Sequence, residues 1–374
     1  MPANEPKTKK PKIFDFSKHS CRPIALKIAY FGYNYHGLES QESDTVETIE
    51  SKLFQALLTT KLIPSRKGCK WSKCGRTDKG VSSFDQILGL FIRSKLPLNT
   101  PGTFSFSDLT DPEKLNSYDS VLDLVDEEFE YCQMLNNLLP PDIRVLGWSP
   151  VSSSFDARFG CLFRHYNYFF DPRDYNIELM QQAAVKYVGS HDFRNFCKVD
   201  PSKPENMTFV RTILESKIVL LDKGIAVFDI KGTAFLWHQV RCLVAILFLV
   251  GKELESPDLV DQLFDLSLHG DSGRPTYDMA PDYPLVLVEC GYPEGTFNWQ
   301  SFNQGATFQK SVETLIKMQQ ELSIKHAQLS IFLGIMGSVE AGQDKKYVPV
   351  MSRTRCDSLM ECKRKSAKSK EMMK

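Results

Sequence analysis

Apolar and polar residues in the first part of the chain follow two different periods, which predict a strand, a helix and a second strand. Residues 24–30 (IALKIAY) alternate in polarity, as is typical of a strand with one buried face. Residues 46–58 carry apolar side chains three and four positions apart, which predicts a helix with one buried face. The run QILGLFI at 86–92 is almost continuously apolar and predicts a buried strand.

The second part of the chain continues this mixture. Strands are predicted at 164–170, 211–220, 225–231 and 285–290, and helices at 177–188, 236–250, 257–264 and 308–335. Ser256 and Pro257 fit the N-cap and the first position of the third of these helices. Because most strands look hairpin-connected, we expect an α+β fold rather than a doubly wound parallel sheet.

The length of 374 residues is too great for one ordinary domain and predicts two. We expect a disordered basic tail at 1–20, an N-terminal α/β lobe at 21–150, a C-terminal α/β lobe at 151–295, and a helical extension with a basic tail at 296–374. Within the first lobe, residues 99–130 are acidic, with Lys114 as their one basic residue, and are expected to form a surface insertion.

Charge balance, cysteine content and the length of the apolar runs limit the kinds of protein that the chain can be. The 46 Lys and Arg residues balance 46 Asp and Glu residues, so a nucleic-acid partner requires a basic face that is offset by acids elsewhere. Ten cysteines without a C-x-x-C pair, and an N-terminus without an apolar signal segment, predict reduced thiols in an intracellular protein. The longest apolar run, at 242–250, is too short to cross a membrane, which takes ~20 residues.

The sequence gives no signal for a metal or a nucleotide cofactor. Its seven histidines are dispersed, and no H-x-x-x-H or H-E-x-x-H occurs. The lysine loop that cradles phosphates and the glycine fingerprint of dinucleotide-binding folds are also absent. We therefore expect the chemistry to proceed without a metal, a nucleotide or another cofactor.

One short stretch, KCGRTDKGV at 73–81, presents a carboxylate among positive charges. Asp78 lies two residues after Arg76 and directly before Lys79, and glycines on either side favour a bend. Nearby positive charge lowers the pKa of a carboxyl group, so we expect Asp78 to be ionised and able to act as a nucleophile or general base. From the pattern alone, a turn carboxylate in a salt bridge with Arg76 or Lys79 is the alternative.

A second candidate is Arg241, which lies on an otherwise apolar predicted helix, one turn after His238. A charge at such a position is costly unless it is paired or reaches solvent. Arg241 therefore either extends to solvent from an exposed start of the helix, or pairs with a buried carboxylate, for which Asp78 is the natural candidate.

The third candidate is the strand FRHYNYFF at 163–170, in which Arg164, Tyr166 and Tyr168 share one face. Aromatic residues that alternate with Arg and His suit stacking on bases and contact with phosphates. The alternative is a sheet face that packs on a helix, because Tyr and Phe are common in strands.

These stretches resemble the TruA family of tRNA pseudouridine synthases. The resemblance rests on GRTDKGV at 75–81, FDARFGCLFRHYNYFF at 155–170, HDFRNFCK at 191–198 and GTAFLWHQVRCLVAILFLVG at 232–251. The order and spacing of four motifs make the resemblance specific, whereas GRTD alone would be weak.

The chain is most similar to the eukaryotic branch of that family, which modifies positions 38 and 39 in the anticodon stem-loop. This likeness rests on FDFSKH at 14–19, LPPDIRVLGW at 139–148, GKELESPDLVDQL at 251–263 and RCDSL at 355–359. The resemblance covers about 14–295 and a short piece at 348–359. Ser83 and Asp85 depart from it, since small residues are expected there, and their effect is expected on the packing of the loop.

The resemblance implies a fold, a reaction and partners. The family has two RRM-like α/β lobes whose mixed or antiparallel sheets flank a central catalytic cleft, and it forms homodimers that hold tRNA across both subunits. Its reaction isomerises uridine in RNA to pseudouridine without a cofactor. The compartment expected is the nucleus, the cytoplasm or both. Alternatives are a synthase of the same family with another tRNA or mRNA target, and a non-catalytic tRNA-binding chaperone.

The resemblance also assigns residues. Asp78 matches the catalytic aspartate, Tyr166 the tyrosine that stacks on the target uracil, and Arg241 the arginine that pairs with that aspartate, while Tyr168 is expected in the core. Contacts with the RNA substrate are expected from Arg76, Thr77, Lys79, Arg158, Arg164 and His238.

Overall fold

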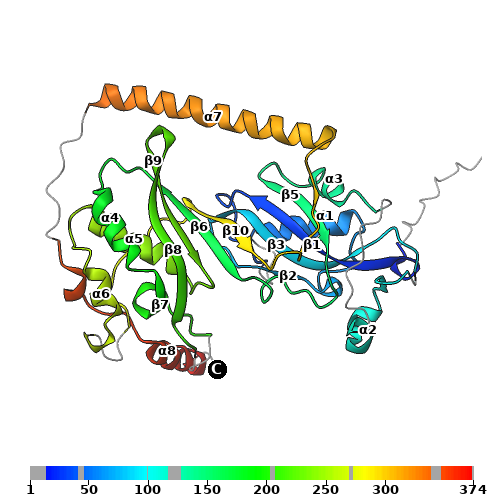
Figure 1. Ribbon diagram of the computed structural model, residues 1–374, viewed down its shortest axis with the longest axis horizontal. Helices are drawn as coiled ribbons and strands as arrows, with labels where there is room; N and C mark the ends of the chain where they lie inside the picture. The colour runs from blue at the N-terminus through cyan, green and yellow to red at the C-terminus, as the bar shows by residue number, and fades with distance from the viewer. Residues whose placement is uncertain are drawn as a thin grey trace, which may run out of the picture.

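The computed structural model describes residues 14–40, 46–98, 100–116, 128–202, 207–268, 273–337 and 347–372. Its framework is one mixed sheet, in which neighbouring strands follow the order β11-β5-β1-β3-β10-β6-β9-β8-β7. Figure 1 shows two lobes side by side, with this sheet running through both. The expectation of an α+β fold is therefore confirmed.

The N-terminal lobe packs two helices on one face of its sheet. Its strands are β1 (Ser20–Tyr30), β2 (Ser72–Lys73), β3 (Ser82–Arg93) and β5 (Ile143–Pro150), and its helices are α1 (Ile49–Thr59) and α3 (Tyr131–Asn136). Apolar residues that alternate along β1 and β3 meet the apolar face of α1 in one buried cluster. Thr48 and Ser51 cap the start of α1 with reciprocal hydrogen bonds.

The C-terminal lobe repeats this arrangement around a longer apolar helix. Its strands are β6 (Phe163–Phe170), β7 (Gly189–Asp192), β8 (Val210–Leu221), β9 (Ile225–Gly232) and β10 (Leu285–Gly291), and its helices are α4 (Ile177–Val185), α5 (Gln239–Gly251) and α6 (Leu259–Phe264). The helix predicted at 257–264 begins at Leu259, because Asp258 is its N-cap and Ser256 only accepts a hydrogen bond from the Asp258 N–H.

Strand β10 joins the two lobes. It pairs antiparallel with β6 over most of its length, and it pairs parallel with β3 at only two positions, Val286 with Ser82 and Leu287 with Ser83. The same residue, Leu287, lies opposite Tyr166 of β6. The junction between the lobes is therefore short, and it lies just after the segment that carries Asp78.

The described part of the predicted surface insertion at 99–130 is partly buried. It contains β4 (Phe104–Ser105), which pairs with β1, and the short helix α2 (Pro112–Asn116). Phe104, Leu109 and Leu115 form a small buried cluster against the sheet. Glu128 is also buried, and its carboxylate lies 3.5 Å from the guanidinium of Arg22, itself buried on β1.

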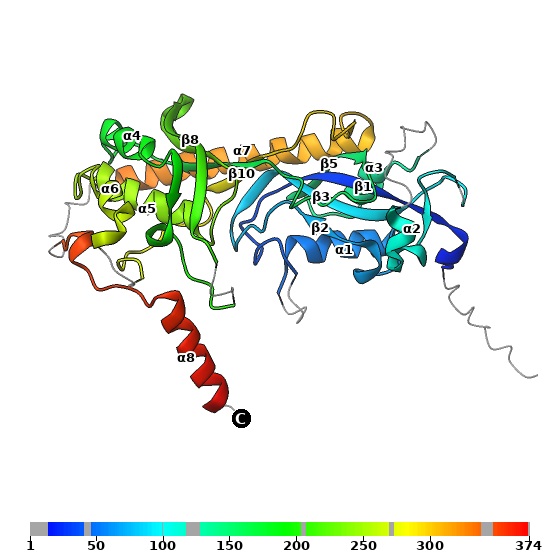
Figure 2. The same ribbon diagram turned by 60° about the horizontal axis from the view of Figure 1, so that its bottom comes forward.

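The last part of the chain returns to the first lobe before it reaches the second. The short strand β11 (Gln300–Ser301) pairs with β5, and the long helix α7 (Ala306–Met336) follows it. Helix α8 (Leu359–Met372) carries the basic C-terminal segment and projects from the C-terminal lobe in Figure 2. In the described residues no helix combines the length and the apolar character needed to cross a membrane.

The tail predicted at 1–20 is described only in its last part, since residues 1–13 lie outside the described residues. A 3-10 helix spans Phe16–Lys18, and β1 already begins at Ser20. The side chain of Phe14 stacks on His19 at 4.8 Å between ring centres. Residues 14–20 of the predicted tail therefore have a defined structure, and the first strand begins one residue ahead of the predicted lobe boundary.

Candidate active site

Asp78 lies in the loop between β2 and β3, and the loop is held by a neighbouring bend at 35–38. The Thr77 carbonyl accepts a hydrogen bond from the Leu38 N–H at 3.1 Å, and the Gly80 N–H donates to the Tyr35 carbonyl at 3.2 Å. Gly80 has φ of +78°, a conformation that strongly favours glycine. These contacts fix the backbone on both sides of Asp78, whose side chain is 32% exposed.

Thr77 is turned into the protein. Its hydroxyl lies 2.7 Å from the Tyr30 hydroxyl, and the residue is buried. This contact ties the loop to β1, so Thr77 helps to hold the loop, and its contact with substrate stays a prediction.

The start of α5 provides the closest basic group to Asp78. His238 caps this helix in a left-handed conformation, with φ of +60°, and its Nε2 atom lies 3.4 Å from Asp78 Oδ2. The indole of Trp237 stacks on the His238 ring at 4.5 Å. A strained backbone at a non-glycine residue is often found at functional sites, and here it aims the imidazole at the carboxylate.

Arg241 does not form the direct ion pair predicted for it. Its Nε donates to the Ala280 carbonyl at 2.8 Å, and no atom of its guanidinium lies within 4 Å of the Asp78 carboxylate in the described chain. The Ala280 N–H in turn donates to the Arg241 carbonyl. Arg241 thus fastens the 280 loop to α5, and it acts on Asp78 only through its charge.

The predicted direction of the pKa of Asp78 is wrong. Burial of the carboxyl group raises its pKa above the usual value, while the charge of Arg241 and the Trp237 side chain lower it only in part. The negative charge of Asp282 adds to the upward shift. The prediction counted neighbouring positive charge and had no means of counting desolvation.

His238 is neutral at physiological pH. Burial lowers the pKa of its imidazole to about 4, and the positive charges of Arg241 and Lys198 act in the same direction. An uncharged imidazole beside Asp78 can orient the carboxylate by a hydrogen bond without neutralising it.

The positive residues that flank Asp78 in sequence are directed elsewhere. The Arg76 guanidinium lies 3.1 Å from the Glu39 carboxylate and is 61% exposed, and Lys79 is exposed as well. The alternative interpretation of Asp78, as a turn carboxylate in a salt bridge with Arg76 or Lys79, therefore has no support from the contact that Arg76 makes.

Tyr166 lies across the junction from Asp78. Its ring packs edge-on against Phe235 at 5.2 Å, and the residue is only partly buried. Burial holds the pKa of its phenol well above the usual value, and the nearby Asp78 charge contributes to the shift. Tyr166 is therefore a neutral aromatic ring close to the carboxylate. Tyr168 is buried in the core, as predicted.

The guanidinium of Arg164 forms hydrogen bonds with backbone carbonyls of neighbouring segments. It donates to the carbonyls of Cys74 at 3.0 Å, Arg158 at 2.8 Å and Thr233 at 3.0 Å. These bonds connect the start of the Asp78 loop to two segments of the C-terminal lobe. The Arg164 guanidinium would have to give up some of these hydrogen bonds in order to contact RNA as expected. Arg158, in contrast, is exposed.

The sequence patterns did not single out Trp237, Lys198 and Asp282, which also act on this site. Trp237 and Lys198 lie in the motifs that carried the resemblance, and they could have been found by their place in those motifs. Asp282 lies between two prolines in PDYP at 281–284, and nothing in that pattern indicates a site. Its carboxyl carbon would lie 2.8 Å from a Cβ atom added at Gly80, so the two loops are in close contact.

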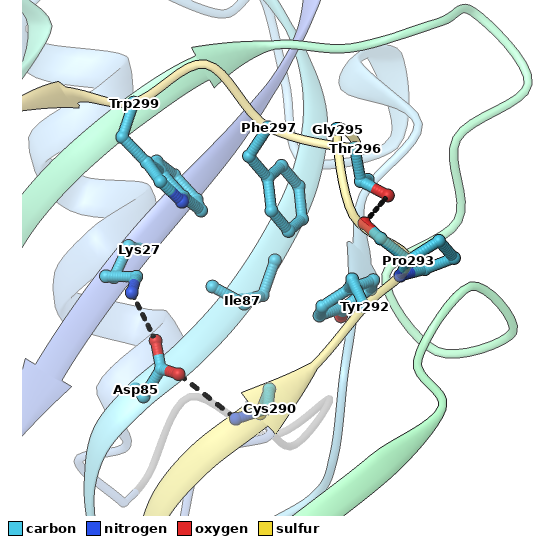
Figure 3. Close-up of a pocket in the computed structure, with 10 residues that line it drawn as sticks. All are labelled: Lys27, Asp85, Ile87, Cys290, Tyr292, Pro293, Gly295, Thr296, Phe297 and Trp299. Carbon is cyan, nitrogen blue, oxygen red and sulfur yellow. Dashed lines mark hydrogen bonds and ion pairs between the residues drawn. The ribbon is translucent and has the colours of Figure 1, made fainter.

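Ser83 and Asp85, the two departures from the family pattern, hold the junction of the lobes. Ser83 Oγ donates to the Leu287 carbonyl at 3.1 Å, and Asp85 Oδ2 accepts from the Cys290 N–H at 3.0 Å. Asp85 Oδ1 also lies 3.1 Å from Lys27 Nζ. Figure 3 shows these two side chains in the wall of a pocket whose lining includes none of the predicted site residues. Since Leu287 pairs with Tyr166, these bonds fix β3 relative to the strand that carries Tyr166.

We predict that Asp85→Asn lowers kcat about tenfold and leaves KM for the substrate nearly unchanged. The substitution removes the charge that pairs with Lys27 and weakens the bond to Cys290, and small misplacements of reacting groups are costly. Steady-state kinetics would measure this split. Asp222→Asn, at an exposed carboxylate in the turn before β9, is the matched control, and equal kcat values for the two variants would contradict the prediction.

Described residues of the chain contain no cluster of His, Cys, Asp or Glu side chains suited to a metal ion. All ten cysteines are free thiols, and eight of them are buried.

Comparisons with known proteins agree on one family. The family model described as "tRNA pseudouridine synthase" matches residues 183–293. Proteins named "tRNA pseudouridine(38/39) synthase" are 44% identical in Homo sapiens, over 75% of this chain and 58% of that protein, and 38% identical in Bos taurus, over 94% of this chain and 78% of that protein. The protein of the same name in Saccharomyces cerevisiae is 46% identical, over 78% of this chain and 62% of that protein. The chain thus spans between about three fifths and four fifths of the length of these relatives.

Proposed function

The chain belongs to the TruA family of tRNA pseudouridine synthases, and on this premise we propose that it isomerises uridine to pseudouridine at positions 38 and 39 of the tRNA anticodon stem-loop. The observation that carries the proposal is the arrangement of Asp78, which lies on a fixed loop at the junction of two lobes, 3.4 Å from a neutral His238. The relatives named for this activity include proteins that this chain matches over most of its length.

The reaction needs a carboxylate, a base-binding surface and a route for one proton. The bond between N1 of uracil and C1′ of the sugar breaks, the base turns, and C5 forms a bond to the same carbon, while C5 loses its proton and N1 gains one. Asp78 is the group proposed to attack the sugar or to remove a proton from it. No electrons are gained or lost, so the reaction requires no redox cofactor.

Tyr166 is proposed as the surface on which the uracil stacks. The residue is only partly buried, its ring is held edge-on by Phe235, and it lies close enough for the Asp78 charge to raise its pKa. Stacking of a base on an aromatic side chain contributes ~1–3 kcal/mol and tolerates rotation of the base in its own plane. The neutral phenol can also hand a proton to the turning base.

The RNA itself is proposed to be held by exposed positive side chains around the loop, namely those of Arg76, Lys79 and Arg158. Extruding the target nucleotide costs a few kcal/mol, and phosphate contacts offset that cost. Arg76 is paired with the exposed Glu39 carboxylate, a contact that a phosphate can replace. Arg241, Arg164 and Thr77 are proposed to keep the loop and α5 in place.

Each lobe is proposed to be RRM-like, and two copies of the chain are proposed to form a homodimer that holds one tRNA. The C-terminal lobe runs β6-α4-β8-β9-α5-β10 with strand order β10-β6-β9-β8, which is the β-α-β-β-α-β topology of that class. The N-terminal lobe has the same order in β5-β1-β3-β2. We propose the nucleus, the cytoplasm or both as its compartment, in keeping with ten free thiols.

The proposal is tested with purified protein and an unmodified tRNA that carries uridine at positions 38 and 39. Pseudouridine is mapped by carbodiimide treatment and primer extension. Conversion at either position is the expected result. A folded protein that binds the tRNA and converts neither position, but converts another uridine in total tRNA or mRNA, would replace the proposed substrate, and binding without any conversion would point to a chaperone.

We predict an acid limb in the pH profile of kcat/KM that lies above the pH expected for an ordinary aspartate. Asp78 has to be ionised, and burial raises its pKa, so activity falls as the pH drops through that raised value. The charge of Arg241 lowers this pKa and the charge of Asp282 raises it. Arg241→Gln is therefore expected to move the limb to higher pH, and Asp282→Asn to lower pH.

These opposite shifts make the two variants controls for each other. A loss of packing would lower the whole profile without moving its limb, whereas a change in local charge moves the limb. Shifts of the same sign, or none, would contradict the assignment of the limb to Asp78.

A further inference from the structure

Lys198 lies beside the candidate active site, on a segment that is anchored in the core. The 3-10 helix Arg194–Phe196 directly before it has two buried residues. The Lys198 N–H donates a hydrogen bond to the Trp237 carbonyl at 3.1 Å. Trp237 precedes His238, whose imidazole lies 3.4 Å from the Asp78 carboxylate. The backbone of Lys198 is therefore held next to the segment that faces this carboxylate.

The ammonium group of Lys198 has no counterion in the described part of the chain. The residue is only partly exposed, and none of the described carboxylates lies within 4 Å of its Nζ atom. Other partly exposed lysines are paired, such as Lys27 with Asp85 at 3.1 Å and Lys73 with Glu50 at 2.6 Å. Withdrawing a charge from water without a partner is costly. A half-buried ammonium without a counterion is therefore suited to an anion that arrives with a ligand.

The charge of Lys198 acts on the groups around the carboxylate. Burial raises the pKa of the Asp78 carboxyl group, and the positive charge of Lys198 opposes this rise. Burial lowers the pKa of the His238 imidazole, and the charge of Lys198 lowers it further. Since the long stem of a lysine is flexible, these effects and the bond to the Trp237 carbonyl together place the ammonium at the edge of the site.

Two guanidinium groups also act on that imidazole, but both are engaged with backbone. The Nε atom of Arg241 donates to the Ala280 carbonyl at 2.8 Å. The Nη1 atom of Arg274 donates to the Tyr277 carbonyl at 3.0 Å, and its guanidinium lies over the Tyr277 ring. Of these three cations, Lys198 is the one whose charged group makes no such contact with the described residues, so it is the one available to a substrate.

We propose that Lys198 binds a phosphodiester group that flanks the target uridine. Each ribose of an RNA chain carries a phosphate on either side, so a nucleotide whose sugar meets Asp78 brings two negative charges into the site. An ammonium binds phosphate as a point charge and can follow it as the nucleotide is extruded. The contact offsets part of the cost of extrusion. The inference rests on the proposed function and deepens it by naming a residue that holds the target nucleotide.

The test measures how tightly the full chain binds an anticodon-arm RNA in two forms. One form has native phosphates, and in the other the two linkages that flank the target uridine are uncharged methylphosphonates. We expect the wild type to bind the neutral form about tenfold more weakly. Lys198→Gln is expected to bind the native form about tenfold more weakly, and to lose less than about twofold more with the neutral linkages. The slope of log K against log salt should fall by about 0.7–0.9.

Lys252→Gln is the matched control, because it removes the same charge from an exposed lysine at the other end of α5. It is expected to bind the native RNA as the wild type does and to keep the full effect of the neutral linkages. Lys198→Met retains most of the apolar stem and is the second variant, with the same expected result as Lys198→Gln. Thermal unfolding followed by circular dichroism establishes that each variant is folded.

A wild type that binds both forms of the RNA equally would overturn the inference, whatever the variants do. So would a folded Lys198 variant with wild-type affinity, or one that binds weakly and still loses tenfold with the neutral linkages, since Lys198 would then act on Asp78 and not on phosphate. Pseudouridine formation in the native RNA is measured separately. Binding through Lys198 without conversion would refute the proposed function alone, and conversion without an effect of the neutral linkages would refute this inference alone. Absence of binding to either form would overturn both.

Discussion

Asp78→Asn is expected to reduce pseudouridine formation at least about 10³-fold while tRNA binding is retained. Removal of a general base or a nucleophile costs losses of this size, because no other group takes over its role. The groups of His238, Trp237 and Tyr166 near the carboxylate are a neutral imidazole, an indole and a phenol, and none of them can replace it. Binding persists because the substitution removes a negative charge that repels phosphates.

The measurement is single-turnover conversion of a tRNA that carries uridine at both positions, together with the affinity of each variant for that tRNA. Asp282→Asn is the matched control, since it removes the same charge from the adjacent loop, which is in close contact with Gly80. We expect it to stay within about tenfold of the wild type. Wild-type rates for Asp78→Asn would remove Asp78 from the catalytic role and leave the proposed mechanism without its central group.

The elements of the two lobes could be predicted because each carries a local pattern. The alternation in 164–170 and the apolar period of 236–250 correspond to β6 (Phe163–Phe170) and α5 (Gln239–Gly251), with ends within a few residues of those predicted. The loop with Asp78 was identified by its glycines and charges. In each case the sequence pattern and the helix, strand or loop that it predicts lie within the same short stretch of chain.

The arrangement around Asp78 could not be predicted, because it depends on distance and burial. The expected pair with Arg241 is replaced by a contact between Arg241 and the Ala280 carbonyl, while His238 lies nearer to the carboxylate. His238 has a left-handed backbone conformation at the start of α5, which turns its imidazole toward Asp78. The pattern of apolar and polar residues gives no indication of such a conformation. Burial then reverses the direction of the pKa shift that charge alone suggested.

The pairing of strands that joins the two lobes could not be predicted either, because the paired residues are far apart in the sequence. Two residue pairs between β3 and β10, about 200 positions apart in the chain, complete the sheet. Ser83 and Asp85 depart from the family pattern and were expected to disturb the packing of the loop. They instead form the side-chain bonds that hold β10 at this point.

The acidic segment at 99–130 contains one carboxylate whose burial its composition does not indicate. Its carboxylates predicted a solvated surface, yet Glu128 is buried, and its oxygens accept from the Ser94 hydroxyl and from the Lys95 and Phe129 N–H groups. The same carboxylate faces the buried guanidinium of Arg22 at 3.5 Å. One acid among many is thus part of the interior, and its partner lies more than 100 positions earlier in the chain.

Glu128→Gln is expected to lower the free energy of unfolding by about 3–5 kcal/mol. The two charged side chains are 1% and 3% exposed, so the substitution removes a buried carboxylate charge that lies 3.5 Å from the buried guanidinium of Arg22. Glu130→Gln, at an exposed position two residues later, is the matched control and should stay within about 0.5 kcal/mol of the wild type. Urea denaturation followed by circular dichroism measures both. Equal stabilities for the two variants would mean that the buried pair does not hold the end of the acidic segment to β1, and that the hydrogen bonds from Ser94 and the backbone suffice.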